Sequence, residues 1–236
     1  MKIRFAELNI ELCNRYVHTE RMCRDFAADF DVPDLVASVT DEEIEVEQKA
    51  AAAPVPAGYA EFICLYRKLA EQLPRFGAFV FHAAVVVCDG RAYAFAAPSG
   101  TGKSTHIALW LRHFGERAYV LNGDKPVFRL TDGGFIACGT PWCGKERQGV
   151  NRTAPLAALC FLTRGKTNEI APIPCDEAVT RLFSQVLVPH EPDTAERFLA
   201  LLDTLVRSTP AYLLRCNMEE EAAAVAYAGM NKGEHT

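Results

Sequence analysis

APSGTGKST, Ala97–Thr105, is the most informative stretch of this chain. It nearly fits the phosphate-binding pattern G-x-x-x-x-G-K-[ST], except that Ala97 stands where the pattern has its first glycine. In such a loop, backbone N–H groups point inward at an anion, and glycine permits the positive φ angles that this requires. Ala97 has only to end a strand, which costs nothing at negative φ and about 1–2 kcal/mol at positive φ.

The residues expected to bind the nucleotide are consecutive: Ser99, Gly100, Thr101, Gly102, Lys103, Ser104 and Thr105. The two glycines supply the bend, Lys103 reaches the β- and γ-phosphates, and Ser104 offers its hydroxyl to Mg²⁺. ATP and Mg²⁺ are therefore the expected cofactors. The alternative is a glycine-rich turn in front of a core helix.

The flanking residues predict a strand before this loop and a helix after it. The runs AFVFHAAVVV (78–87) and RAYAFAA (91–97) are rich in β-forming residues, and Asp89-Gly90 between them is a strong hairpin signal. We therefore expect an antiparallel hairpin whose second strand leads into the loop. One apolar helical face follows the loop, formed by Ile107, Trp110, Leu111 and Phe114.

Two polar residues are candidates because of their places on the predicted strands. Mg²⁺ needs a carboxylate near the phosphates, and the apolar strand in RAYVLNGDKPVF (117–128) delivers Asp124 to the sheet edge. The alternative for Asp124 is a turn residue in NGDK. His82 lies on the strand before the hairpin, whose turn brings it near the loop end of the next strand. The alternative for His82 is a hydrogen-bonded sheet histidine.

The polar segment GTPWCGKERQGVN (139–151) follows another predicted strand. It can bind substrate or close over phosphate, and the alternative is a solvated loop with a surface tryptophan. Cys138 and Cys143 flank GTPW, but two thiols are too few for a structural zinc site, which takes four ligands.

Composition limits the classes of function. The 236 residues carry a net charge of -5 with both signs mixed and no basic stripe, so no nucleic-acid partner is expected. No run of 18 apolar residues exists and the N-terminus is interrupted by charges, so neither a membrane span nor a signal peptide is expected. The nine scattered cysteines fit a reducing compartment, and a cytoplasmic location follows.

The low-complexity stretch KAAAAPVPAG (49–58) predicts a linker. It divides the chain into a strand-rich N-terminal extension with linker (1–58) and a phosphate-loop domain (59–236). Within the extension, MKIRFAELNIELC predicts an edge strand and a short acidic segment follows. Residues spaced as in a helix begin the second part: Phe62, Leu65, Tyr66, Leu69 and Leu73.

A histidine-bearing strand, a short hairpin, APSGTGKST and a strand ending in Asp resemble the HPr kinase/phosphorylase family. That family is related to ATP-dependent phosphoenolpyruvate carboxykinases, and the resemblance covers roughly residues 79–162. It implies an α/β fold with a mixed sheet in which an antiparallel hairpin feeds the phosphate loop. The matching residues are Gly100, Gly102, Lys103 and Ser104 in the loop, His82 upstream of the hairpin, and Asp124 on the next strand.

Family members carry an acidic pair at the position of Asp124, and one carboxylate acts as the base on the acceptor hydroxyl. Here the other member is Gly123 or Lys125, so Asp124 must bind metal, act as base or do both, or Glu146 must assist. The segment CGTPWCGKERQG differs from the family's own glycine-containing signature. The family's protein substrate and its phosphorylase activity are therefore not carried over.

We expect an ATP- and Mg²⁺-dependent phosphotransferase that acts on a serine-type hydroxyl of a protein, peptide or small molecule. His82, Lys103, Asp124 and Glu146 are the expected catalytic residues, with Ser104 and Asp124 as metal ligands. Lys145 or Arg147 is a candidate to stabilise transferred charge. The alternatives are a nucleotide-binding regulatory module without turnover and a carboxykinase-like enzyme acting on a small carboxylic acid. The resemblance also allows a homo-oligomer.

Overall fold

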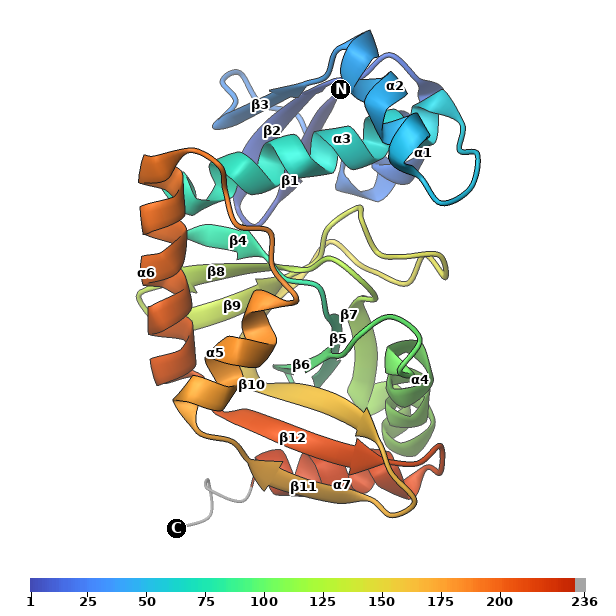
Figure 1. The fold of residues 1–236 in the computed structure, drawn as a ribbon, viewed down its shortest axis with the longest axis vertical. Helices are drawn as coiled ribbons and strands as arrows, with labels where there is room; N and C mark the ends of the chain where they lie inside the picture. The colour runs from blue at the N-terminus through green and yellow to red at the C-terminus, as the bar shows by residue number, and fades with distance from the viewer. Residues whose placement is uncertain (232–236) are drawn as a thin grey trace.

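Two β-sheets of different size organise the chain in a computed structural model that describes residues 1–231 (Figure 1). The small sheet has the order β1-β2-β3, from β1 (Lys2–Phe5), β2 (Leu8–Cys13) and β3 (Leu35–Ser38). The large sheet has the order β4-β8-β9-β10-β6-β5-β7, with β12 paired to β10 and β11 paired to β12. Its strands are β4 (Ala78–Val80), β5 (Ala84–Cys88), β6 (Arg91–Ala96), β7 (Ala118–Asn122), β8 (Val127–Thr131), β9 (Gly134–Cys138), β10 (Thr153–Arg164), β11 (Glu169–Pro172) and β12 (Ala211–Cys216).

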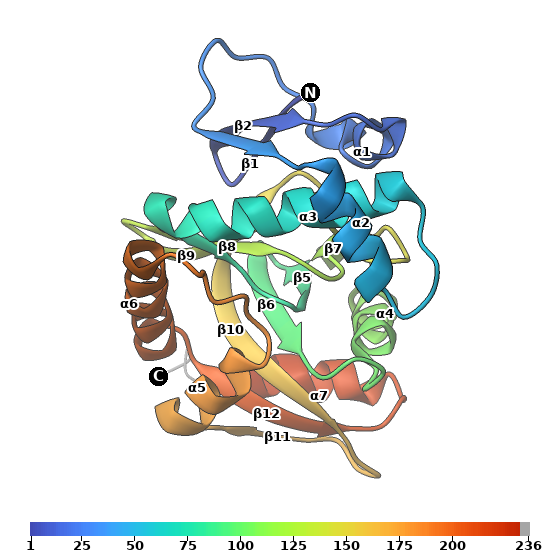
Figure 2. The same ribbon diagram turned by 45° about the horizontal axis from the view of Figure 1, so that its top comes forward.

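Helices cover both faces of the large sheet. The α-helices are α1 (Val17–Met22), α2 (Asp41–Ala50), α3 (Ala57–Gln72), α4 (Lys103–Phe114), α5 (Cys175–Phe183), α6 (Pro192–Ser208) and α7 (Glu221–Met230). Helices α5 and α6 pack on one face of the sheet and α4 and α7 on the other (Figures 1 and 2). Within residues 1–231, none of the helices combines the length and the apolar character needed to cross a membrane.

Strand β5 shows why the sequence before the hairpin is apolar without interruption. Ala84 and Val86 belong to the buried cluster under α4 and α7, whereas Val85 and Val87 belong to the cluster under α5 and α6. Both faces of the strand are therefore buried, and alternation with polar residues is lost.

Strand β10 makes the large sheet mixed and curled. It begins antiparallel to β9, continues parallel to β6, and its last half also runs parallel to β12. The predicted hairpin is confirmed, because β5 pairs antiparallel with β6 and the turn residues Asp89 and Gly90 have φ of 50° and 77°. The α/β architecture with a mixed sheet agrees with the expected fold class.

Two segments that were predicted as single strands are broken. MKIRFAELNIELC is not one edge strand but the hairpin β1–β2, which turns at Ala6 and Glu7 with φ of 49° and 57°. The run 78–87 divides into β4, which pairs with β8, and β5, which pairs with β6 and β7. His82 lies in the break. The β-propensity of these residues predicts a strand, but it does not show at which residue the chain leaves one neighbouring strand for another. The break at His82 was therefore not predictable from the sequence.

The acidic segment near residue 41 is helix α2. Its N-terminus carries a capping box, in which Thr40 Oγ1 accepts from the Glu43 backbone N–H at 3.2 Å and the Glu43 carboxylate accepts from the Thr40 N–H at 2.9 Å. The pattern T-x-x-E is the sequence signature of this cap and could have revealed the helix.

Helix α3 lies between the two sheets (Figure 2). One buried cluster joins Ile10 and Leu12 of the small sheet, Leu65 of α3, and Val80 and Val127 of the large sheet. Helix α3 begins at Ala57, inside the predicted linker 49–58, and it packs against both parts of the chain.

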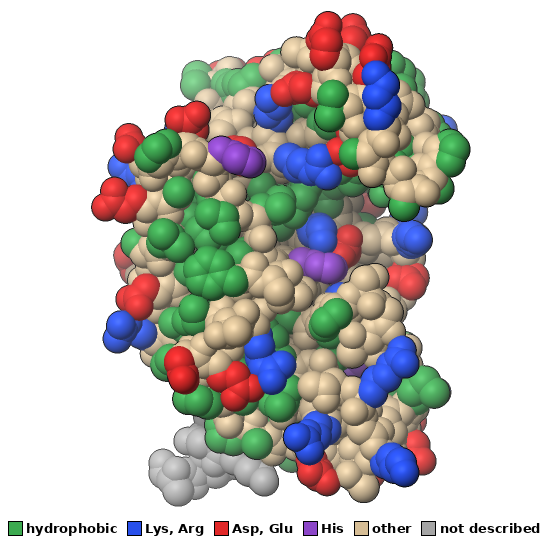
Figure 3. All heavy atoms as spheres, viewed as in Figure 1, with side chains coloured by type: hydrophobic (Ala, Val, Ile, Leu, Met, Phe, Trp, Pro, Cys, Tyr) green, Lys and Arg blue, Asp and Glu red, His purple; other side chains and the backbone are tan. Residues whose placement is uncertain are grey.

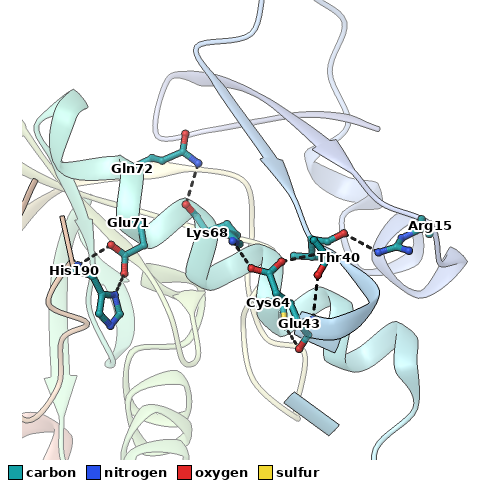
Figure 4. A network of polar contacts seen from close by, with 9 residues as sticks. Arg15, Thr40, Glu43, Cys64, Lys68, Glu71, Gln72 and His190 are labelled. Atoms are coloured by element: carbon teal, nitrogen blue, oxygen red, sulfur yellow. Dashed lines mark hydrogen bonds and ion pairs between the residues drawn. The ribbon is translucent and has the colours of Figure 1, made fainter. Parts of the chain in front are cut away.

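Polar contacts fasten α3 to the segments beside it (Figure 4). Lys68 Nζ lies 2.5 Å from a Glu43 carboxylate oxygen, which ties α3 to α2. Glu71 accepts from the His190 backbone N–H at 2.9 Å and lies 2.6 Å from His190 Nδ1. These contacts join α3 to the segment between α5 and α6.

Candidate functional site

The register of the central strands brings the predicted site residues to one sheet edge. Ala84 at the start of β5 pairs with Phe95 near the end of β6, and the next residue of β5 pairs with Asn122 at the end of β7. Because β5 runs antiparallel to both neighbours, its start lies at the same edge as their carboxyl ends. His82, the loop after β6 and Asp124 consequently meet at this edge.

The loop 97–102 connects β6 to α4 and has the backbone of an anion site. Gly100 and Gly102 have φ of 78° and 121°, which favour glycine. Ala97 is buried, and its φ angle is not positive. Its side chain therefore causes no backbone strain at the first position of the loop. Among residues 1–231 no side chain caps the start of α4 at Lys103, so its first backbone N–H groups are open to an anion.

Lys103 lies folded back over the loop. Its Nζ donates a hydrogen bond of 2.7 Å to the Ala97 carbonyl. Burial lowers the pKa of Lys103, with the nearby charge of Asp124 raising it and that of Lys125 lowering it. The loop lysine therefore lies within electrostatic reach of the residues that follow β7.

Ser104 contacts Glu146 rather than Asp124. The Ser104 hydroxyl donates to a Glu146 carboxylate oxygen at 3.2 Å. Hydroxyl and carboxylate oxygens are ligands that Mg²⁺ accepts, and Mg²⁺ in nucleotide sites commonly takes one or two carboxylates together with phosphate oxygens. Within residues 1–231 no group of three or more His, Cys, Asp or Glu side chains is placed to hold a metal. Ser104 and Glu146 thus suit an Mg²⁺ ion whose remaining ligands are phosphate oxygens and water.

His82, Asp124 and Lys125 form a cluster at the end of β7. His82 Nε2 lies 3.1 Å and Lys125 Nζ lies 3.4 Å from the same Asp124 oxygen, Oδ1. Burial by itself raises the pKa of Asp124, but the hydrogen bond from His82 and the charge of Lys125 together outweigh it and the pKa lies below its ordinary value. Asp124 is therefore an ionised carboxylate at neutral pH.

Asn122 shapes the turn that carries this cluster, a role that the sequence did not reveal. Its fully buried side chain accepts through Oδ1 from the backbone N–H groups of Asp124 and Lys125, both at 2.8 Å. Its Nδ2 donates to the carbonyl and the hydroxyl of Thr140, at 3.1 and 3.0 Å. One asparagine thus joins the turn to the segment 139–152. Its place in NGDK, at the head of a polar turn, was the available signal.

Two cavities of about 470 Å³ each open at this sheet edge. The first, called the loop cavity, is lined by Gly100, Thr101, Gly102, Thr105, His106, Leu162, Thr163, Arg164, Gly165, Cys216, Asn217 and Met218. The second, called the His82 cavity, is lined by Met22, Tyr59, Phe62, Ile63, Tyr66, Arg67, His82, Asp124, Lys125, Trp142, Cys143, Gly144, Lys145, Ser184, Gln185, Val186 and Leu187. One cavity therefore adjoins the glycines of the loop and the other adjoins Asp124.

Helix α3 and Trp142 build the aromatic wall of the His82 cavity. Trp142 is 5% exposed, stacks on Phe62 with ring centroids 4.9 Å apart, and donates from Nε1 to the Phe62 carbonyl at 2.9 Å. It is a buried anchor of the segment 139–152 and not a surface residue. In the space-filling view, a histidine, a basic and an acidic side chain lie together near the middle of one face, beside hydrophobic side chains (Figure 3).

The remaining candidates separate into those at a cavity and those away from one. Lys145 and Cys143 line the His82 cavity, whereas Arg147 lines neither of the two. Cys138 is fully buried, and burial raises the pKa of its thiol to about 12. Within residues 1–231, Cys138 and Cys143 belong to no group of three or more His, Cys, Asp or Glu side chains that could hold a metal ion.

Comparisons with known proteins reveal a distant structural similarity. No family model matches the chain, and no curated protein matches its sequence. Among solved structures, the chain is similar to the Hpr(Ser) kinase/phosphatase from Coxiella burnetii, with a TM-score of 0.39 and 9% sequence identity. That similarity covers 66% of this chain and 98% of the other. The functional interpretation therefore depends on the geometry of the site itself.

Proposed function

We propose that the chain is an ATP- and Mg²⁺-dependent phosphotransferase that phosphorylates a hydroxyl group. One observation carries the proposal: a glycine loop with a free helix N-terminus and an ionised Asp124 held by His82 share one sheet edge. A phosphate donor site thus lies next to a candidate base. Transfer between such neighbours is catalysed mainly by positioning and by neutralising charge.

The loop side would hold the donor. The backbone N–H groups of the loop and of the first turn of α4 bind phosphate oxygens, and Lys103 leaves the Ala97 carbonyl to reach the β- and γ-phosphates. Ser104 and Glu146 would hold Mg²⁺, which when bound neutralises charge on the phosphates. This use of Glu146 answers the need for a second carboxylate that Gly123 and Lys125 cannot meet.

The acceptor hydroxyl would enter the His82 cavity and meet Asp124. The lowered pKa keeps this carboxylate ionised, so it can orient the hydroxyl and take its proton. Transfer of a phosphoryl group through a loose transition state places little demand on base strength, so a weakly basic carboxylate suffices. His82 fixes the direction of the carboxylate, and it is a positioning residue in this reaction.

The walls of the His82 cavity favour an acceptor with an apolar portion. Phe62, Tyr66 and Trp142 supply aromatic surface, and Lys145 adds a positive charge at the cavity. The acceptor is a small molecule, or a peptide or protein segment whose hydroxyl side chain enters the cavity.

The test is transfer of label from ATP carrying ³²P on its γ-phosphate. The purified protein is incubated with labelled ATP, Mg²⁺ and an extract of the source cells, beside Lys103→Ala and Asp124→Asn. Lys49→Ala and Asp203→Asn serve as matched controls, because both side chains are exposed and line neither of the two cavities. Label on one acceptor that disappears in both site variants and persists in both controls supports a kinase. ATP that is bound but stays intact would instead favour a regulatory module.

A further inference from the structure

A histidine in α4 is buried beside the phosphate loop. His106 is 2% exposed, and within residues 1–231 its buried Nδ1 has no hydrogen-bond partner. On the other side of the ring, Trp110 Nε1 lies 3.0 Å from His106 Nε2. An indole N–H can only donate, so Nε2 must accept, and the neutral ring then carries its proton on Nδ1.

The surroundings keep this ring neutral and fixed. Because Nε2 accepts the indole N–H, it carries no proton, and the imidazole is therefore uncharged. Phe95 packs edge-to-face against it with ring centroids 4.6 Å apart. The orphan atom is therefore an oriented donor, and buried donors in folded proteins are nearly always satisfied.

His106 is one of the residues that line the loop cavity. The cavity lies between the glycines of the loop and the carboxyl ends of β10 and β12. Leu162, Cys216 and Met218 give its lining an apolar portion, and Met218 is 77% exposed. A volume of about 470 Å³ is typical of small-molecule sites.

We propose that the loop cavity binds the nucleoside part of the nucleotide and that His106 Nδ1–H donates a hydrogen bond to it. The inference rests on the proposed function, because the loop must hold the phosphates for the nucleoside to reach this cavity. Thr105 and His106 follow Ser104 directly, so a nucleoside attached to phosphates at the start of α4 lies beside them. Leu162 and Met218 offer apolar and thioether surface to the flat base.

Titration calorimetry with Mg²⁺-ATP and Mg²⁺-tripolyphosphate tests the inference, because only ATP carries a nucleoside. His106→Phe should weaken ATP binding by about three- to tenfold, the usual worth of one hydrogen bond, and leave tripolyphosphate affinity within about twofold. Unchanged ATP affinity, or an equal loss for both ligands, would overturn the inference. Failure of the unmodified chain to bind either ligand would instead refute the proposed function.

Trp110→Phe is the control, since His106→Phe also deprives Trp110 of its acceptor. This control breaks the same indole–imidazole bond but keeps the imidazole, in which an acceptor on the nucleoside can still select the Nδ1–H tautomer, so ATP affinity should fall less than in His106→Phe. An equal fall in the two variants would assign the effect to packing and contradict the inference.

Nitrogen-15 NMR of the imidazole rings reads the donor directly in the unmodified chain, whether or not the variants fold. We expect the Nδ1–H tautomer of His106, and a shift of its Nδ1 proton on addition of Mg²⁺-ATP but not of Mg²⁺-tripolyphosphate. An Nε2–H tautomer, or a proton signal that ATP leaves unmoved, would overturn the inference.

Discussion

His82 Nε2 lies 3.1 Å from Asp124 Oδ1, although the two residues are 42 positions apart in the sequence, with the hairpin, the loop and α4 between them. Each residue reaches this point from a different strand of the large sheet. His82 precedes β5, Asp124 follows β7, and the pairing of β5 with β7 brings these ends together. The contact orients the carboxylate, and its removal should affect transfer more than nucleotide binding.

We predict that Asp124→Asn lowers the rate of phosphoryl transfer by about 10²- to 10⁴-fold, the usual contribution of a positioned base. His82→Gln should lower kcat by only about tenfold, because it loosens the carboxylate without removing it. Steady-state kinetics with the identified acceptor measure both effects, and calorimetry should find ATP affinity within about threefold of the unmodified chain. A loss of ATP affinity that accounts for the whole effect would show that the pair serves binding and not transfer.

Asn122→Ala should unfold the chain more readily, because it removes four hydrogen bonds around one fully buried side chain. Each unpaired buried polar group costs about 1–3 kcal/mol, so we expect the free energy of unfolding to fall by at least about 2 kcal/mol. Urea denaturation measures the loss. The matched control is Asn151→Ala, whose exposed side chain donates to the Arg4 carbonyl at 3.1 Å, and it should change the free energy far less. Equal effects would contradict the assigned role of Asn122.

The segment that carries Glu146 depends on a close approach at Gly139. A Cβ atom there would lie 1.9 Å from the Val150 carbonyl oxygen and 3.0 Å from the Leu121 carbonyl oxygen. Both are backbone atoms, so Gly139→Ala must move the segment away from β7. We predict a loss of about 1–3 kcal/mol of unfolding free energy, measured by urea denaturation, together with weaker Mg²⁺-dependent ATP binding.

The control for that change is Gly133→Ala. The nearest atom to a Cβ at Gly133 is Thr131 Oγ1 at 3.8 Å, an ordinary contact, so this variant should retain its stability and its ATP affinity. If the two alanine variants behave alike, the packing at Gly139 does not hold the segment in place.

The sequence predicted the parts of the site that depend on local chemistry. Asp89-Gly90 fixes the hairpin, the glycines fix the loop, and a hairpin feeding the loop necessarily brings His82 toward it. These features depend only on residues that are close together in the sequence, so they can be recognised from the sequence without the rest of the fold.

The rest depends on contacts between distant segments. Ser104 meets Glu146 only because the segment 139–152 packs against β7, and no local pattern encodes that path. The aromatic wall of the His82 cavity likewise requires α3 to lie across the large sheet. Sequence periodicity predicted that helix but not the surface that it covers.

The stability of the chain should depend on pH through His106. Its pKa is about 4 in the fold against an ordinary value of 6.5, so the unfolded chain binds more protons between these two values. The stability that the neutral ring contributes is complete above pH 6.5, is lost as pH falls toward 4, and does not change further below that. His106→Phe cannot take up a proton, so its free energy of unfolding should fall about 2 kcal/mol less between pH 7 and pH 4.5 than that of the unmodified chain. Urea denaturation at both pH values gives this difference, in which the contributions of the other titrating groups cancel. Parallel losses in the two proteins would contradict the pH dependence assigned to His106.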